Sequence, residues 1–322
     1  MLNDAIALYA GNPALFAGAV FVFGLLVGSF LNVVIWRLPI MLDREWRAQA
    51  VELLHAADGA PLADAVSQSD AAPQTAGTPP PPTAEPFNLL RPRSNCPHCK
   101  APIKAWQNIP LISWLILRGK CAACKSPISA RYPLIELTTG VLSAAVAWHF
   151  GFGPAAACAL LVTWALIALT GIDIDHQLLP DDITLPLMWA GLLAAVVIGP
   201  IGGSPLPVSP RDAILGAIAG YLSLWLVFHA FRLATGKEGM GYGDFKLYAA
   251  LGAWLGWQLL PLVILLSAAT GAIVGIAMIL FRGRDRSAPM PFGPYLAAAG
   301  WLAMLYGGTL MRFYLQLAGL EP

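Results

Sequence analysis

Long uninterrupted apolar runs dominate this chain of 322 residues and restrict what it can fold into. A transmembrane helix needs about 20 predominantly apolar residues. Charged residues make up only 11% of the chain, against about 25% in soluble domains. The sequence therefore predicts an all-α polytopic membrane protein. Six runs are of spanning length: Ala14–Ile35, Leu134–Phe150, Ala155–Ile172, Ile183–Ile201, Ala213–Phe231 and Tyr295–Leu317.

A seventh apolar block, Leu247–Phe281, is too long for a single spanning helix. Gly256 and Pro261 lie within it, and both residue types interrupt helices. We therefore expect two helices in this block and about eight transmembrane helices in all.

The basic residues predict the orientation of these helices, because Lys and Arg accumulate on cytoplasmic loops. Eleven of the 19 basic residues lie between Arg37 and Arg131. With eight spans, 17 basic residues are cytoplasmic and only Arg211 and Arg312 lie outside. The expected parts are a first transmembrane helix in residues 1–36, a cytoplasmic loop in residues 37–133 and a membrane-embedded domain in residues 134–322.

Within this loop the composition shifts to Ala, Pro, Gln, Ser and Thr from Asp43 to Glu85. The first part, DREWRAQAVELLHAA, is compatible with a short surface helix. The remainder, about residues 58–85, cannot bury enough apolar surface to offset the entropy lost on ordering. We expect it to be a disordered insert.

Two CxxC pairs follow the insert with 21 residues between them. Each pair can clamp one side of a tetrahedral ion, and four thiolates leave no open position for catalysis. We predict a structural Zn²⁺ site in a small module, residues 91–131, called the cysteine module below. Two disulfides are the alternative, but a cytoplasmic loop is reducing. His98 is expected to be exposed, and Cys158 is expected to pack within its apolar run. The predicted ligands are Cys96, Cys99, Cys121 and Cys124.

Two acidic motifs, GIDIDHQLLPDD and GMGYGDFK, each follow an apolar run. A carboxylate at the margin of a bilayer usually marks a functional site. The predicted topology puts both motifs on the cytoplasmic side, so Asp173 and Asp244 are able to meet. Two close carboxylates share one proton and activate a water, as in aspartic proteases. In the first motif, Asp182 is expected to cap a helix, and Asp175 and Asp181 to be solvated.

Three polar residues near the first two spans have open interpretations. Asn32 and Arg37 interrupt an apolar helix, and helix packing or anchoring at the membrane surface explains them as well as function does. Glu136 is a lone acid near the start of the second span. A salt bridge to Arg131 or Lys125 is the alternative to a functional role.

Together these motifs resemble the bacterial type IV prepilin peptidases, also called leader peptidase and N-methyltransferase, of the GxGD aspartyl protease class. The segments GSFLNVVIWRLP, the paired CxxC, NIPLISWLILRGKC, SARYPLIEL, DIDHQLLPD and GYGD occur in the family's order, and the resemblance covers nearly the whole chain. One departure is Gln107, because the family commonly has Glu before NIP. The insert ahead of Cys96 is also longer than expected.

The resemblance implies that Asp173 and Asp244 are catalytic and that the four cysteines bind zinc. It also implies cleavage of a short basic leader after a glycine, followed by methylation of the new N-terminus from S-adenosylmethionine. Substrates would be type IV prepilins or type II secretion pseudopilins at the inner membrane. The donor is expected to enter from the cytoplasm, which makes Asn32, Arg37 and Glu136 the candidates for its site.

Other functions fit the sequence less well. An ion-coupled transporter or channel predicts acids within the spans and repeated halves, whereas the key acids here lie at span ends. A purely structural scaffold leaves the acids at the membrane margin without a role. A peptidase without methyltransferase activity remains an alternative. The net charge of +1 gives no reason to expect nucleic acid as a partner.

Overall fold

The computed structural model describes residues 2–58, 87–201, 205–237, 239–282, 290–317 and 319, and the predicted insert lies almost wholly outside them. Within these residues the secondary structure is helical, apart from two isolated β-bridges. In these described ranges, eight helices have 14 or more residues: α2 (Pro13–Asp58), α4 (Arg131–Phe150), α5 (Pro154–His176), α6 (Asp181–Val197), α7 (Pro210–Thr235), α8 (Tyr242–Leu255), α9 (Leu260–Arg282) and α10 (Gly293–Leu317).

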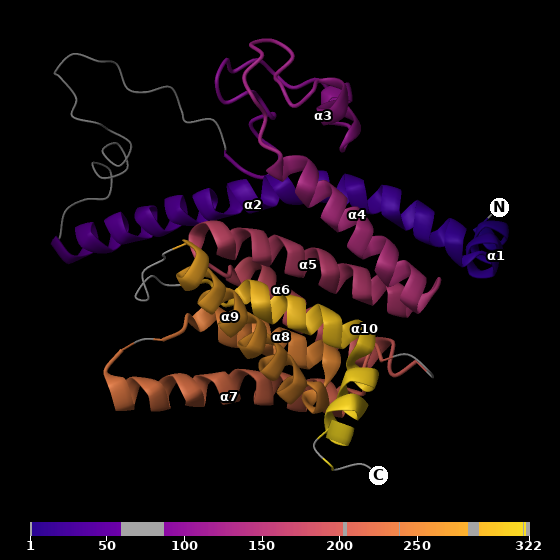
Figure 1. Cartoon of the computed structure of the whole chain (residues 1–322). Helices are drawn as coiled ribbons and strands as arrows, with labels where there is room; N and C mark the ends of the chain where they lie inside the picture. Colours follow the sequence, from indigo (N-terminus) through magenta and orange to yellow (C-terminus); the bar gives the residue numbers. More distant parts are fainter. Residues whose placement is uncertain are drawn as a thin grey trace.

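Two short helices and two 3₁₀ turns lie before and between the long helices in the described residues. Helix α1 (Leu2–Gly11) precedes α2, and α3 (Ile112–Ile116) lies in the cysteine module after the 3₁₀ turn η2 (Ala105–Asn108). A second 3₁₀ turn, η3 (Trp257–Leu259), joins α8 to α9. The long helices form one bundle, and the cysteine module lies on its outer side against α2 and the start of α4 (Figure 1).

Four helices in the described part of the chain are long and apolar enough to cross a membrane: residues 13–54 of α2, then α5, α7, and residues 257–281 of η3 and α9. The predicted break in the seventh apolar block is confirmed, because α8 ends at Leu255 and α9 begins at Leu260. Gly256 turns the chain there with φ 78°, a conformation that glycine adopts readily. Pro261 is the second residue of α9, where its missing N–H has no helical partner to lose.

Helix α2 is longer than the apolar run that predicted it. It continues through Pro39 to Asp58, for 46 residues in all, or about 69 Å at 1.5 Å per residue. The segment expected as a separate surface helix is therefore the second half of α2. Strong helix formers in this segment and an ion pair between Arg47 and Asp43 (2.9 Å) support the continuation.

Helix α8 lies at the centre of the bundle, and every residue from Leu247 to Leu255 is buried. Glycines let α7 approach it closely. A Cβ on Gly216 would lie 2.1 Å from the carbonyl oxygen of Gly252, and one on Gly220 would lie 2.6 Å from that of Tyr248. Small residues four apart are the usual means by which membrane helices bring their backbones together.

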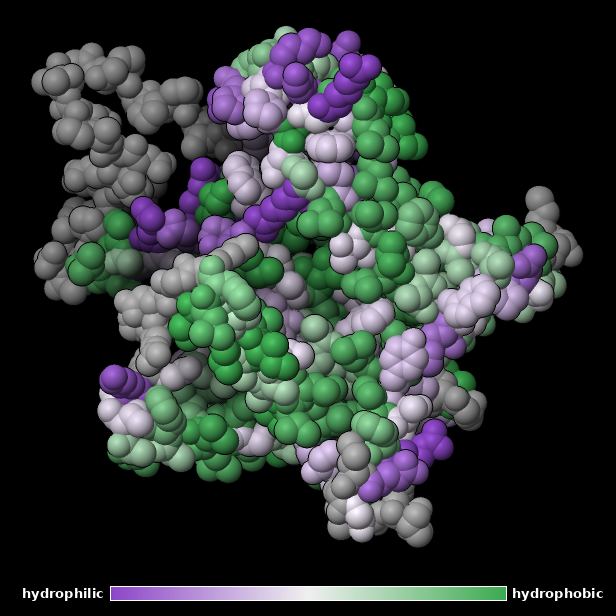
Figure 2. All heavy atoms as spheres, in the orientation of Figure 1, coloured by the Kyte–Doolittle hydropathy of each residue, from purple (hydrophilic) through white to green (hydrophobic). Residues whose placement is uncertain are grey.

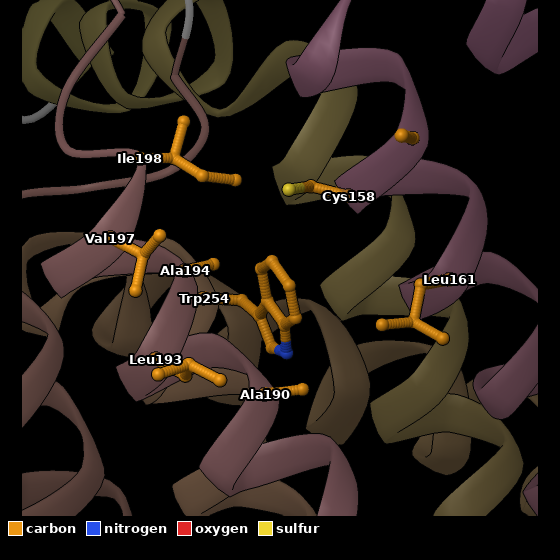
Figure 3. A pocket seen from close by; sticks show the side chains of 9 residues that line it. Cys158, Leu161, Ala190, Leu193, Ala194, Val197, Ile198 and Trp254 are labelled. Carbon is orange, nitrogen blue, oxygen red and sulfur yellow. The ribbon is translucent and has the colours of Figure 1, made fainter.

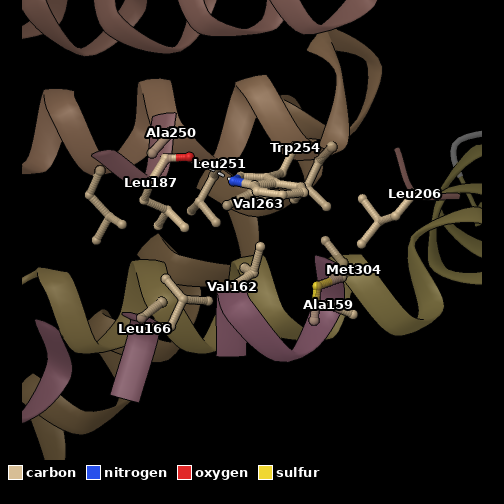
Figure 4. Close-up of a cluster of buried hydrophobic side chains, with 14 of the residues drawn as sticks. Ala159, Val162, Leu166, Leu187, Leu206, Ala250, Leu251, Trp254, Val263 and Met304 are labelled. Carbon is tan, nitrogen blue, oxygen red and sulfur yellow. Dashed lines mark hydrogen bonds between the residues drawn. The ribbon is translucent and has the colours of Figure 1, made fainter. Parts of the chain in front are cut away.

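Side chains from α5, α6, α8, α9 and α10 converge in the core around Trp254 (Figure 4). The indole N–H of Trp254 donates to the carbonyl oxygen of Leu187 at 2.9 Å, so its polar atom is satisfied inside an apolar cluster. This contact fixes α8 against α6.

A wholly apolar pocket opens between α5 and α6 beside Trp254 (Figure 3). Cys158 lines it and is buried, in agreement with its expected packing role. Cys158 and Asp173 are 15 residues apart on α5, or about 22 Å along the helix. The pocket therefore lies away from the acidic motifs.

Candidate active site and metal centre

Asp173 lies inside the last turn of α5, which continues past the apolar run to His176. Its side chain is buried, with 5% exposure. Its Oδ2 accepts the backbone N–H of Gly293, the first residue of α10, at 2.9 Å. A buried carboxylate needs such a donor to offset its lost hydration. The contact joins two residues that are 120 positions apart, at the end of the bundle where α5 stops and α10 begins (Figure 1).

Asp244 is the third residue of α8, after the glycine-rich turn that the second motif predicted. It is buried, with 6% exposure, and its backbone N–H bonds to the carbonyl oxygen of Gly241 at 3.2 Å. Among the described residues, its Oδ1 is a buried oxygen without a hydrogen-bond partner. Such an oxygen carries a free-energy penalty, and in native proteins it usually has a functional explanation.

The two acids lie near each other, because Leu179 packs against a glycine beside each of them. A Cβ on Gly243 would lie 2.7 Å from the Cβ of Leu179, and one on Gly293 would lie 3.1 Å from its Cδ2. Gly293 and Leu179 were not predicted as site residues. The sequence PFGP, which directly precedes the last apolar run, was the local signal for a turn at Gly293.

Two ion pairs flank this pair of acids. Asp175 binds Arg131 of α4 through both carboxylate oxygens, at 2.7 and 2.5 Å. Asp181 binds Lys246 of α8 at 2.6 and 2.7 Å. Both acids are exposed, as expected, and each also has a basic partner on a helix distant in sequence.

The predicted cap at Asp182 was wrong. The N-cap of α6 is Pro180, and Asp182 is exposed in the first turn of the helix. An acid at this position still interacts favourably with the positive end of the helix dipole.

The four predicted cysteine ligands come together in the cysteine module. Their sulfur atoms all lie within 4.8 Å of one another, and Sγ of Cys96 is 3.8 Å from Sγ of Cys124. Backbone N–H groups of Cys99 and His98 lower the pKa of the Cys96 thiol to about 6, whereas burial and hydrogen bonds with the other three thiols raise the pKa of Cys99 to about 11. His98 is exposed and outside the cluster, as expected. The donor set fits a tetrahedral metal ion.

The two halves of this cluster are copies of one turn. Cys96 N–H bonds to Ala101 and Lys100 N–H bonds to Cys96. The same two bonds recur 25 residues later, in Cys121 with Ser126 and in Lys125 with Cys121. Bridges between 95 and 102 and between 120 and 127 share this offset. The repeat is visible in the sequence as CPHCKAPI and CAACKSPI, although it was not predicted.

Asn32 and Glu136 lie at the same contact between α2 and α4. Asn32 donates to the carbonyl oxygens of Gly28 and Tyr132, both at 3.2 Å. A Cβ on Gly28 would lie 2.7 Å from Cα of Glu136, so the helices are almost in backbone contact.

In the described part of the chain Glu136 forms no ion pair with Arg131 or Lys125, and Arg131 binds Asp175 instead. Its Oε2 accepts the backbone N–H of Leu111 at 2.8 Å, and the hydroxyl of Ser29 is a second partner. Glu136 thus ties the cysteine module to α4.

Arg37 lies apart from these two residues. It is buried, and its guanidinium donates to the carbonyl oxygens of Asn88 at 2.9 Å and Pro92 at 2.7 Å. The ring of Phe87 lies 5.7 Å from its central carbon. Arg37 therefore holds the segment that leads into the cysteine module, and only Asn32 and Glu136 of the three candidates share a contact region.

Comparison with known proteins divides the chain in two. The model of the bacterial peptidase A24 N-terminal domain matches residues 22–150, and that of the type IV leader peptidase family matches residues 160–276. The first range contains the clustered cysteines, and the second contains Asp173 and Asp244. No solved structure gives a significant match.

Three curated relatives that match over nearly the full length are named prepilin leader peptidase/N-methyltransferase. The protein from Stutzerimonas stutzeri is 52% identical over 98% of this chain and 99% of its own. That from Aeromonas hydrophila is 54% identical, with 96% and 97% covered. That from Pseudomonas aeruginosa is 51% identical, with 97% and 98% covered.

Proposed function

The chain belongs to the type IV leader peptidase family, and from this premise we propose that it is an aspartic endopeptidase that removes the leader from type IV prepilins or type II secretion pseudopilins and N-methylates the new N-terminus. The observation that carries the peptidase proposal is the pair of buried carboxylates at one end of the bundle. Asp173 is held by a backbone N–H, and Asp244 keeps a buried oxygen without a partner among the described residues.

The proposed mechanism uses these two acids as one unit. Their mutual repulsion disfavours double ionisation, so the pair holds one proton, and its titration belongs to both residues together. The ionised carboxylate takes a proton from water, while the protonated one polarises the scissile carbonyl. Attack gives a tetrahedral intermediate, and a proton from the pair then goes to the leaving amine as the peptide bond breaks.

The proposed setting is the bacterial inner membrane, with eight spans and the acids at the cytoplasmic face. Each predicted span corresponds to one of the long helices, which supports this topology. Helix α2, about 69 Å long, exceeds the roughly 30 Å hydrocarbon core, so part of it must lie outside the bilayer. The basic residues of its second half and of the cysteine module favour the cytoplasmic side.

The metal proposed for the cysteine module is Zn²⁺ in a structural role. A Zn–S bond of about 2.3 Å puts tetrahedral sulfurs about 3.8 Å apart, and the Cys96 and Cys124 sulfurs are separated by 3.8 Å. Four thiolates leave no position for water, so the ion would order the module and take no part in cleavage. Cys96, Cys99, Cys121 and Cys124 would hold it.

For methyl transfer, we propose that Asn32 and Glu136 contribute to the site for S-adenosylmethionine at the α2–α4 contact. The donor supplies an electrophilic methyl group on a cationic sulfonium when bound. The Glu136 carboxylate suits a cation, and the Asn32 amide suits a hydrogen bond to the amine. Arg37 would act at a distance, by holding residues 87–92, the segment that leads into the cysteine module.

Incubation of the purified protein with purified prepilin and S-adenosylmethionine tests this function. We expect mass spectrometry to find mature pilin that lacks the leader and carries one N-terminal methyl group. Intact prepilin after incubation with zinc-loaded, folded protein would refute the peptidase proposal. Cleaved but unmethylated pilin would favour the alternative of a peptidase alone.

A further inference from the structure

The cysteine module has an unusual charge distribution. Residues 87–135 contain eight basic residues and no acidic one. All eight are exposed, and only Arg131 has an ion-pair partner among the described residues. The other seven are Arg91, Arg93, Lys100, Lys104, Arg118, Lys120 and Lys125.

The same module exposes an apolar face that a water-soluble domain would bury. In α3, Ile112, Leu115 and Ile116 are 55%, 65% and 66% exposed, while Ser113 is buried and bonds to Ile109. These three apolar residues are spaced i, i+3 and i+4, which puts them on one face of the helix. The helix therefore exposes its apolar face and buries the polar Ser113, the reverse of the usual arrangement in a water-soluble domain. Further exposed apolar side chains nearby are Ile103, Trp106 and Ile109.

This apolar face is held beside the bundle. The Leu111 N–H bonds to Glu136 of α4 at 2.8 Å and attaches the module to the bundle. Within the module, the Trp114 indole N–H donates to the carbonyl oxygen of Ile128 at 3.3 Å. Helix α4 in turn exposes Leu134 on its outer side. Figure 2 shows hydrophobic surface on one side of the module, and this surface continues into the flank of the bundle. Hydrophilic surface lies at the end of the module that points away from the bundle.

We propose that the cysteine module is a membrane-interface element that rests on an anionic phospholipid leaflet. Its exposed apolar residues lie at the level of the headgroups and upper acyl chains, and its lysines and arginines contact lipid phosphates. Basic residues beside an apolar face with Trp are typical of interfacial segments. A second protein is the less favoured occupant, because the apolar face is continuous with the flank that would contact lipid. The basic leader of a prepilin would also be repelled by the positive charge.

Photocrosslinking from single positions in nanodiscs tests this placement without any substrate, so it is independent of the proposed function. Benzoylphenylalanine replaces Leu115 in one variant and Ile112 in a second. Val22, which is 57% exposed on the apolar run of α2, gives the reference for a lipid-facing position. Glu52, exposed on α2 about 25 Å beyond Ile35, gives the reference for a position outside the bilayer. Only variants with wild-type zinc content are compared.

In discs that contain phosphatidylglycerol, we expect lipid adducts from Leu115 and Ile112 at levels comparable with Val22, and none from Glu52. In discs of phosphatidylcholine alone the Leu115 adduct should fall several-fold, because this lipid has no net negative charge to attract the basic residues. High salt should have a similar effect in the phosphatidylglycerol discs, because salt screens that attraction. Lipid adducts from Leu115 and Ile112 no higher than from Glu52 would overturn the proposal. Equal labelling in both disc types would overturn the role of anionic lipid. In a separate reaction with prepilin added, crosslinking to prepilin in place of lipid would assign the face to substrate.

Discussion

The backbone N–H of Gly293 donates a hydrogen bond to Oδ2 of Asp173 across 120 positions of sequence, with 2.9 Å between the two atoms. This bond puts the start of α10 directly against an acid near the end of α5. The glycine is also sterically required, because its Cβ position is 2.6 Å from Oδ2 of Asp173 and 3.1 Å from Cδ2 of Leu179. In a variant with a side chain at position 293, contacts this short would displace the Asp173 carboxylate.

We predict that Gly293→Ala lowers kcat for prepilin cleavage by roughly 100-fold with little change in KM, because a displacement of about 1 Å in a catalytic group has an effect of that size. Gly308→Ala is the matched control on the same helix, where a Cβ meets nothing within 4 Å. Steady-state kinetics on both purified variants decide the matter. A Gly293→Ala enzyme with wild-type kcat would mean that this contact does not position Asp173 for catalysis.

The cysteine cluster predicts one zinc ion per chain. Cys96→Ser or Cys121→Ser removes one of four thiolates, so zinc content and the yield of folded protein should both fall, since metal binding is coupled to folding. Cys158→Ser is the control, because Cys158 is buried in the bundle core and outside the cluster. Elemental analysis measures zinc per chain. Metal-free but folded and active wild-type protein would be the contrary result.

We predict that methylation is separable from cleavage at Glu136. In Glu136→Gln the amide oxygen can still accept the Leu111 N–H, so the cysteine module keeps its attachment while the negative charge is lost. Mass spectrometry should find cleaved pilin with an unmethylated N-terminus. Glu136→Ala removes the acceptor as well and should also lower zinc content or folded yield.

Two results would argue against this separation. Full methylation by the Glu136→Gln variant would make Glu136 a structural residue that only holds Leu111. Loss of cleavage in a zinc-loaded Glu136→Gln protein would show that the two activities are not independent.

The insert of about residues 58–85 should be dispensable for cleavage. Its composition and the order of the family motifs around it motivate this prediction. Replacement with a short Gly/Ser linker should leave the cleavage rate within a few-fold of wild type. A large loss of activity in a zinc-loaded, normally expressed linker variant would instead assign the insert a docking role.

The sequence predicted the helices well because apolar length and Gly or Pro breaks are local properties. The break near Gly256 is an example, since α8 and α9 are separate helices. The clustering of four cysteines was also predictable, because CxxC spacing brings each pair together without knowledge of the fold.

Contacts between distant segments were not predictable from the sequence. The bonds from Gly293 to Asp173 and from Lys246 to Asp181 depend on how helices assemble, and no periodicity encodes them. The far end of α2 was missed for another reason. Apolar content marks the part of a helix that crosses a bilayer, whereas helix propensity favours the continuation of α2 beyond its apolar run. The structure brings Asp173 and Asp244 near each other, and their catalytic role stays a prediction.

The rate of prepilin cleavage by Asp173→Asn and Asp244→Asn tests that role most directly. Asp182→Asn is the control, because Asp182 is exposed in the same motif and, unlike Asp181, has no ion pair among the described residues. Proton transfer by positioned acids contributes about 10²- to 10⁴-fold, and each dyad variant also loses the shared proton. We predict that kcat/KM falls by at least about 10³-fold in each dyad variant and stays at the wild-type value in Asp182→Asn. Wild-type cleavage by either folded, zinc-loaded dyad variant would contradict the account.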